Sequence, residues 1–192
     1  MRHPVILDFE TKHTFRETSE HVKLGISVAG LYDYKTEELH IYEESELPEM
    51  YPILENASIL IGYNIDGFDL PVLKGYYPGD ISQFKTFDIL TDIKNRIGRR
   101  FSLDSIVRAT LNKAKTGHGL RAIQLYREGH IDELKKYCLM DVSLTRELFD
   151  FGIKQNEIYY INGVDKVRLP VEWNRYLNYQ GHDDDLSLTL PF

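Results

Sequence analysis

The pattern of apolar residues changes along this chain, and that change limits the folds that the chain can adopt. Three early runs, Pro4–Phe9, Leu24–Tyr32 and Glu38–Tyr42, are short and β-prone, and each predicts a strand. From Ser102 onward the apolar residues recur instead with the period of a helix. Strands first and helices later predict an α/β domain with a mixed central β-sheet flanked by α-helices.

The middle of the chain alternates between the two patterns. The predicted elements here are a helix over Glu46–Asn56, a strand over Ser58–Gly62, a helix beginning at Asp66, a strand over Phe84–Phe87 and a helix over Asp88–Arg96. The later helices are expected over Leu103–Leu111, Leu120–Arg127 and Ile131 to about Phe151, followed by a C-terminal hairpin of Tyr159–Ile161 and Val167–Val171. We expect one α/β domain over residues 1–155, the hairpin extension over 156–180 and a flexible tail over 181–192.

Bulk properties narrow the class of protein. A chain of 192 residues suits one domain with a substantial core. Cys138 is the single cysteine, so an internal disulfide is excluded and a cytoplasmic location is expected. No apolar run is long enough for a membrane span, and the first residues lack a signal-peptide pattern, so no membrane partner is expected.

The net charge of −7 argues at first against a nucleic-acid partner. The charge is unevenly distributed, however, because the stretch from Lys94 to Lys136 contains 11 basic and 4 acidic residues. That stretch therefore carries +7 and the remainder of the chain −14. A basic middle in an acidic chain fits a surface that follows phosphates beside an acidic metal site, although the same residues can simply solvate helix faces.

Four acidic residues in three separated segments are the main candidates for chemistry. Asp8 and Glu10 lie in VILDFET, Asp69 in IGYNIDGFDLP and Asp141 in KKYCLMDVSLT. Residues i and i+2 of a strand face the same side, so Asp8 and Glu10 are expected to project together. If the fold brings all four together, their charges repel unless metal ions neutralise them. Such clusters support metal-assisted cleavage of phosphodiesters.

The third segment adds a second functional group. Tyr137 and Asp141 are four residues apart on a predicted helix and share one face. Asp141 can then ligate a metal while the Tyr137 hydroxyl reaches the attacking water. Each segment also has a simpler explanation: a solvated strand end for Asp8 and Glu10, a helix cap for Asp69, and a half-buried aromatic for Tyr137.

Taken together, LDFET, GYN-x3-FD and Y-x3-D, within roughly residues 4 to 150, resemble the three exonuclease motifs of the DEDD superfamily. Members of that superfamily are 3′→5′ exonucleases on a ribonuclease H-like fold. YNIDGFDLPVL and YCLMDVSLT are especially similar to the proofreading exonuclease domains of family B DNA polymerases. The superfamily divides by the residue near its last aspartate. Tyr137 stands four residues before Asp141, and Lys136 stands where the other branch has histidine, so the chain resembles the tyrosine branch.

The resemblance implies a role for each motif residue. The four acidic residues would bind two Mg²⁺ or Mn²⁺ ions, and Tyr137 would orient the attacking water. Thr11, Asn64 and Phe68 would contact the terminal nucleotides, with Phe68 stacking or wedging. Lys115, in a polar loop, would meet a phosphate or would belong to an ordinary connection between helices.

The predicted activity is the release of nucleoside 5′-monophosphates from the 3′ end of single-stranded DNA. A 3′→5′ exoribonuclease stays open, because the sequence does not show how the site treats a 2′-hydroxyl. A nucleic-acid-binding module that kept the fold without activity is another alternative, and a ribonuclease H-type endonuclease is disfavoured by Y-x3-D. The final DDDLSLTLPF resembles tails that dock on replication or repair proteins, or it is a plain disordered tail.

Overall fold

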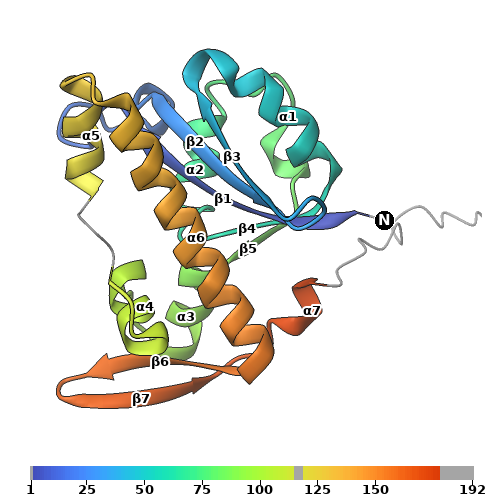
Figure 1. Cartoon of the computed structure of the whole chain (residues 1–192), viewed down its shortest axis with the longest axis vertical. Helices are drawn as coiled ribbons and strands as arrows, with labels where there is room; N and C mark the ends of the chain where they lie inside the picture. The colour runs from blue at the N-terminus through green and yellow to red at the C-terminus, as the bar shows by residue number, and fades with distance from the viewer. Residues whose placement is uncertain (1, 115–118, 178–192) are drawn as a thin grey trace, which may run out of the picture.

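The computed structural model describes residues 2–114 and 119–177, and its centre is a five-stranded mixed sheet (Figure 1). The strand order is β3-β2-β1-β4-β5, where β1 pairs antiparallel with β2 and parallel with β4. The strands are β1 (His3–Thr11), β2 (Ile26–Asp33), β3 (Glu38–Glu43), β4 (Ala57–Gly62) and β5 (Thr86–Asp88). The predicted mixed sheet is therefore confirmed.

Helices flank this sheet, as the sequence predicted (Figure 1). They are α1 (Leu47–Asn56), α2 (Asp69–Leu73), α3 (Ile89–Ile97), α4 (Leu103–Leu111), α5 (Gly119–Arg127), α6 (Ile131–Gln155) and α7 (Asn174–Leu177). Short 3₁₀ turns lie at His21–Lys23, Glu44–Glu46 and Ile81–Gln83. Across residues 2–114 and 119–177, every helix is too short or too polar to traverse a bilayer.

β1 is the central strand, and both of its faces are covered. Leu7 packs with residues of α1 and α2 in one apolar cluster, whereas Ile6 packs with residues of α3, α4 and α6 in another. Side chains alternate across a strand, so the even-numbered residues of β1 share the face of Ile6. Asp8 and Glu10 consequently point to the side of the sheet that α6 covers.

α6 approaches the sheet closely at one place, where β2 carries Gly30. Gly30 pairs with Asp8 across the β1–β2 ladder. A Cβ atom at Gly30 would lie 2.9 Å from both the Cys138 Sγ and the Val142 Cγ2 of α6. In the space left by the missing side chain, the Cys138 thiol donates a hydrogen bond to the Asp8 carbonyl oxygen over 3.3 Å. The glycine thus sets how near α6 lies to the middle of β1.

The second helix begins later than predicted. α2 starts at Asp69 instead of Asp66, because the residues before it form a tight turn. Asn64 adopts a left-handed backbone with φ of 71°, and the Asp66 N–H donates to the Asp88 carboxylate over 3.2 Å. Residues 65–68 therefore form a turn whose backbone is held by Asp88, and the helix begins only at Asp69.

Most other elements begin or end within one or two residues of the predictions, and the following differences have a structural reason. β5 covers Thr86–Asp88 instead of Phe84–Phe87, because only those residues lie beside the end of β4. α6 continues to Gln155, where Asn156 ends it with a left-handed φ of 55°. The predicted hairpin is present but longer, as β6 (Glu157–Asn162) and β7 (Asp165–Pro170).

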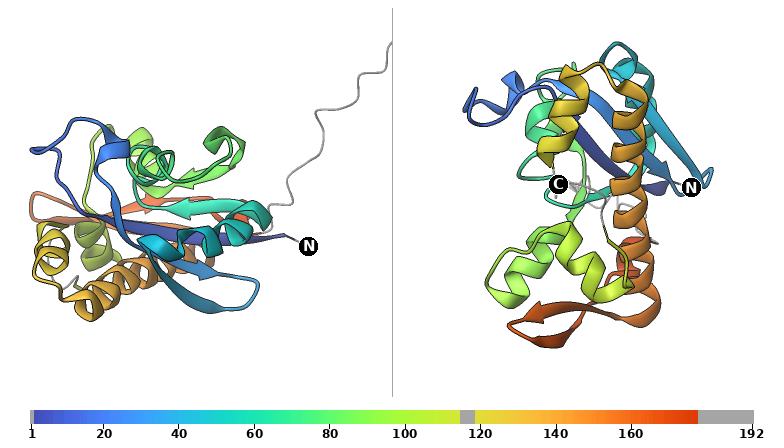
Figure 2. Two further views of the ribbon diagram at one scale, coloured as in Figure 1. Left: turned by 90° about the horizontal axis from the view of Figure 1, so that it is seen from above. Right: turned by 60° about the vertical axis from the view of Figure 1, so that its left-hand side comes forward.

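The hairpin lies beside α4, at the opposite end of the molecule from α5 (Figures 1 and 2). Just after it, Trp173 is fully buried against the Phe149 ring of α6 and the Phe87 ring of β5. Gly152 leaves the space that the indole occupies, and the indole N–H donates to Asp92 over 2.9 Å. Residues after α6 therefore complete the core on that face. The tail expected over residues 181–192 lies outside the described residues.

Candidate metal centre

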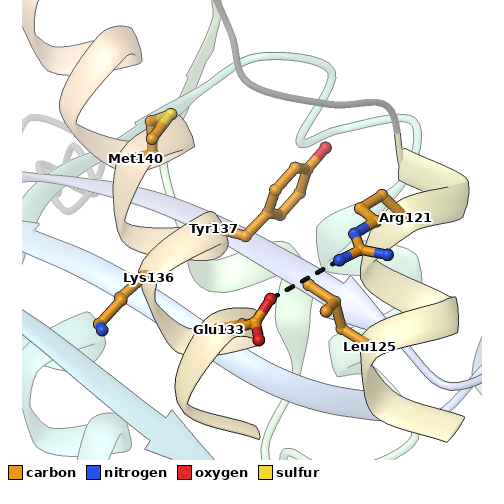
Figure 3. Close-up of a pocket in the computed structure, with 6 residues that line it drawn as sticks. All are labelled: Arg121, Leu125, Glu133, Lys136, Tyr137 and Met140. Carbon is orange, nitrogen blue, oxygen red and sulfur yellow. Dashed lines mark ion pairs between the residues drawn. The ribbon is translucent and has the colours of Figure 1, made fainter. Parts of the chain in front are cut away.

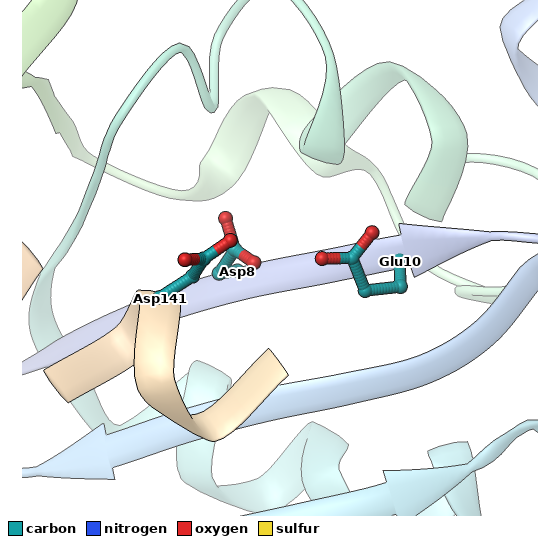
Figure 4. Close-up of side chains that lie close together, drawn as sticks. All are labelled: Asp8, Glu10 and Asp141. Carbon is teal, nitrogen blue, oxygen red and sulfur yellow. The ribbon is translucent and has the colours of Figure 1, made fainter. Parts of the chain in front are cut away.

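Three of the predicted acidic side chains converge on one point. Asp8 and Glu10 project from the end of β1, and Asp141 projects from the middle of α6 (Figure 4). One carboxylate oxygen from each lies within 4.8 Å of the other two. Asp141 is 3% exposed and Glu10 is 9% exposed, so little solvent separates these groups. Like charges this close in a partly desolvated site repel strongly.

Asp69 reaches the same region but makes a different contact. Its Oδ1 accepts a hydrogen bond from the Phe9 backbone N–H over 2.8 Å, and the side chain is 3% exposed. Phe9 lies beyond the last residue of β1 that pairs with β4, so the carboxylate takes the place of a strand partner. Asp69 does not belong to the group of Asp8, Glu10 and Asp141 whose oxygens meet.

Burial is the main cause of the pKa shifts of Asp69 and Cys138. It raises the pKa of Asp69 from 3.8 to about 8, with a smaller contribution from repulsion by Asp88, while the Phe9 N–H opposes the shift. Burial also raises the pKa of the Cys138 thiol, helped by the negative charges of all four carboxylates. The charges of Asp8, Glu10, Asp69 and Asp141 therefore all act on the Cys138 thiol.

Tyr137 lies one helical turn before Asp141, as predicted, and is 5% exposed. Its ring packs among Leu125 of α5, Val28 of β2 and Cys138. It also borders a pocket of about 220 Å³ between α5 and α6 (Figure 3). The other lining residues are Arg121, Leu125, Glu133, Lys136 and Met140. The tyrosine is thus held between the two helices, on the same face of α6 as Asp141.

A larger pocket of about 430 Å³ borders Glu10 directly. Two of the predicted nucleotide-contacting residues, Thr11 and Phe68, line it. Its remaining lining residues are His13, Thr14, Phe15, Leu24, Leu120 and Ile123. The ring of Phe15 packs edge-on against Phe68 with centroids 5.9 Å apart. The pocket is mostly apolar, which suits a planar aromatic group next to the charged cluster.

Asn64, the third predicted nucleotide contact, holds the turn that leads to Asp69. Its N–H donates to Asp88 Oδ1 over 2.9 Å, and its Oδ1 accepts from Arg100 over 2.7 Å. Asp88 also accepts the Thr91 N–H at the start of α3 over 3.1 Å. Asp88 therefore both caps α3 and holds the turn before Asp69.

The chemistry of the converging groups fits a hard divalent cation. Asp8, Glu10 and Asp141 supply only carboxylate oxygens, which Mg²⁺ and Mn²⁺ prefer. A cation bound there would relieve the repulsion among the three charges. Cys138 is close by, but its thiol is hydrogen-bonded to the Asp8 carbonyl.

Sequence reasoning missed several residues of this region. Phe15 and His21 lie in the connection between β1 and β2, and their rings pack together with centroids 5.0 Å apart. Leu120 and Ile123 reach the larger pocket from α5. No local pattern marks such residues, because they become neighbours of Glu10 only through the fold. Lys115 lies outside the described residues.

Comparisons with known proteins agree with this architecture. A family model described as the RNase_H superfamily matches residues 5–151. Among solved structures, the chain is similar to the family B DNA polymerase from the hyperthermophilic archaeon Pyrobaculum calidifontis, with a TM-score of 0.59 and 14% sequence identity. The match covers 81% of this chain and 26% of that one, so the chain spans about a quarter of the polymerase. No curated protein matches the sequence. The predicted ribonuclease H-like fold is confirmed.

Proposed function

Because the chain belongs to the RNase H superfamily, we propose that it is a metal-dependent 3′→5′ exonuclease that acts on single-stranded DNA. Membership of this superfamily supports hydrolysis of nucleic acid in general terms. The proposed 3′→5′ direction, the single-stranded DNA substrate and the release of nucleoside 5′-monophosphates rest on the order and spacing of the three motifs and on the residues around the carboxylates.

One observation carries the proposal. The carboxylate cluster and the apolar pocket of about 430 Å³ share Glu10, so a group held in the pocket lies next to the cluster. A volume of this size falls in the range of small-ligand pockets and suits one nucleotide. An enzyme that cuts within a chain needs a groove that continues on both sides of the cluster. An enzyme that removes terminal nucleotides needs a pocket for the last one.

We assign the metal to the acidic side chains. Asp8, Glu10 and Asp141 would jointly bind the metal ions, and Asp69 would complete the set of ligands once the ions displace its proton. Two divalent cations held by these carboxylates would supply activation of the attacking water and stabilisation of the charge on the departing 3′ oxygen. The close packing of α6 at Gly30 keeps Asp141 opposite Asp8.

Tyr137 is assigned the role of orienting the attacking water. A phenol, with an ordinary pKa of about 10, is a poor base but a good hydrogen-bonding group. The ring is buried in an apolar cluster with Leu125 and Cys138, which supports a defined position for its hydroxyl one helical turn from Asp141.

The larger pocket is assigned to the terminal base. Phe68, held edge-on by Phe15, would stack against it, and Thr11 would contact the sugar at the mouth of the pocket. Asn64 would contact the next nucleotide. Base stacking tolerates any sequence, as an exonuclease without sequence preference requires.

A 3′→5′ exoribonuclease and an inactive nucleic-acid-binding module remain the alternatives. The proposed setting is a reducing cytoplasm, with which the free and buried Cys138 is consistent. Docking of the C-terminal tail on a replication or repair protein is a further proposal. Clamp binding by the whole chain and by a chain lacking residues 183–192 would test it.

The main experiment is digestion of 5′-labelled single-stranded DNA with Mn²⁺ and with EDTA. We expect a ladder that shortens from the 3′ end with Mn²⁺ and no product with EDTA. Asp141→Asn should abolish the ladder, while the exposed-carboxylate variant Glu38→Gln, on the edge strand β3, should keep it. Cleavage of a circular substrate would point to an endonuclease, and faster loss of matched RNA would favour the exoribonuclease. Binding without product would indicate the inactive module.

A further inference from the structure

The loop between α3 and α4 carries two adjacent arginines that the catalytic proposal does not use. Both Arg99 and Arg100 are exposed. The loop is fixed at its two ends, because Gly98 ends α3 with φ of 81° and the Ser102 side chain caps α4 by accepting the Ser105 N–H over 3.2 Å. The two guanidinium groups thus project from a short and well-defined connection.

Arg100 connects this loop to the candidate site. It donates to Asn64 Oδ1 over 2.7 Å, and Asn64 lies five residues before Asp69 in the same turn. A second contact holds the same two segments together, since the Tyr63 hydroxyl donates to the Phe101 carbonyl oxygen over 2.9 Å. The loop therefore borders the segment on which the proposed function places a nucleotide.

Arg99 extends the contacts away from the carboxylates toward the hairpin. It donates to the Asn162 side chain at the end of β6 over 3.1 Å, and its guanidinium lies 4.6 Å from the centroid of the Phe101 ring. Lys166 of β7 adds a third exposed cation, 4.6 Å from the centroid of the Tyr159 ring. These cations form a row that runs from Asn64 to the hairpin.

The row is not neutralised by nearby acids. Within the described residues, Arg99, Arg100 and Lys166 form no ion pair with a carboxylate. Neighbouring cations differ in this respect, because Arg96 pairs with Asp92 over 2.9 Å and Arg108 with Asp104 over 2.7 Å. Exposed cations without a paired carboxylate are available for charge-assisted contacts with phosphates.

We infer that Arg99, Arg100 and the β6–β7 hairpin form a binding track for the phosphates of single-stranded nucleic acid that lie 5′ of the terminal nucleotides. The inference rests on the proposed function for the direction of the strand. The strand would pass from the pocket at Phe68, beside Asn64, to the tip of the hairpin. Affinity would then come largely from this track and would rise with the length of the oligonucleotide.

Binding tests the track independently of cleavage. We would measure the dissociation constants of a fluorescent dinucleotide and of a long oligothymidylate by anisotropy, with Ca²⁺ in place of the reactive metals. For the variant R99Q/R100Q we expect at least about tenfold weaker binding of the long oligonucleotide, since charge-assisted contacts are lost. The loss of two phosphate contacts should make the plot of log binding constant against log salt concentration less steep, by about 1.4 in the slope.

Two control variants separate charge from structure. K35Q/K154Q removes two exposed charges elsewhere and should bind as the unaltered protein does. R99K/R100K keeps the charge and should retain most of the affinity. Equal losses in the lysine and glutamine variants, or long-oligonucleotide binding by R99Q/R100Q that equals K35Q/K154Q, would overturn the track. Failure of the proposed function gives a different result, namely binding along the track by a protein that releases no nucleotide with Mn²⁺.

Discussion

Replacing Asp69 by asparagine should make the metal-free protein more stable at high pH. The buried carboxyl has a pKa of about 8 in the folded protein and an ordinary value of 3.8. Between these values the unfolded chain has released the proton and the folded chain still holds it, so the free energy of unfolding falls as the pH rises. Below pH 4 both states are protonated and the stabilising effect is fully present.

The magnitude follows from the difference between the two pKa values. About four pH units at roughly 1.4 kcal/mol each give an upper limit of about 6 kcal/mol lost between pH 4 and pH 8. Asparagine has no proton to release, and its side-chain oxygen can still accept the Phe9 N–H. At pH 8 without metal, Asp69→Asn should therefore be more stable than the unaltered protein by a sizeable part of that limit.

Urea unfolding in EDTA at several pH values measures this directly, with the fluorescence of the buried Trp173 as the probe. The exposed-carboxylate variant Asp165→Asn serves as the control and should follow the unaltered protein. Adding Mg²⁺ at pH 8 should stabilise the unaltered protein more than the Asp69→Asn variant, since the ion replaces the proton. Parallel stability curves for Asp69→Asn and the control would refute the argument.

The remaining predictions concern the carboxylate cluster and its surroundings. Asp141→Ala should abolish cleavage and leave the metal-free melting temperature unchanged or higher, because it removes one of three repelling charges; digestion and calorimetry check this. Tyr137→Phe should slow turnover on the order of 10²-fold while calorimetric Mn²⁺ affinity stays nearly constant, and an equal loss of Mn²⁺ binding contradicts the assigned role. Phe68→Ala should raise the KM for DNA about tenfold through lost stacking, measured against the unaltered protein at fixed salt. Gly30→Ala should force α6 away from β1, which costs about 1–3 kcal/mol in the free energy of unfolding and lowers kcat even where the variant is fully folded. An unaltered kcat in the folded variant would show that the close approach of α6 is unimportant.

The parts of the site that follow a local period were predictable from the sequence. Asp8 and Glu10 share a face because strands repeat every two residues, and Tyr137 shares a face with Asp141 because helices repeat about every four. The resemblance of the three motifs predicted that Asp8, Glu10, Asp69 and Asp141 would meet. The structure brings carboxylate oxygens of Asp8, Glu10 and Asp141 within 4.8 Å of one another, whereas Asp69 accepts the Phe9 N–H.

Other features depend on contacts between segments that are remote in the chain. The hydrogen bond from Phe9 to Asp69 spans 60 residues, and no local pattern encodes it. The turn that precedes α2 is held by Asp88, 22 residues beyond Asp66, which accepts the Asp66 N–H. Phe15 reaches the larger pocket from an irregular connection, for which sequence periodicity gives no direction.

The burial of Trp173 has a practical consequence for anyone who wishes to isolate the catalytic unit. A fragment that stops after α6 would lack Trp173. The rings of Phe87 and Phe149 would then face water, and the space beside Gly152 that the indole fills would be empty. Losing one such buried indole typically costs about 3–5 kcal/mol, which is a large share of the stability of a small protein. An expression fragment should therefore extend through Leu177, so that the indole can close the hydrophobic face from behind.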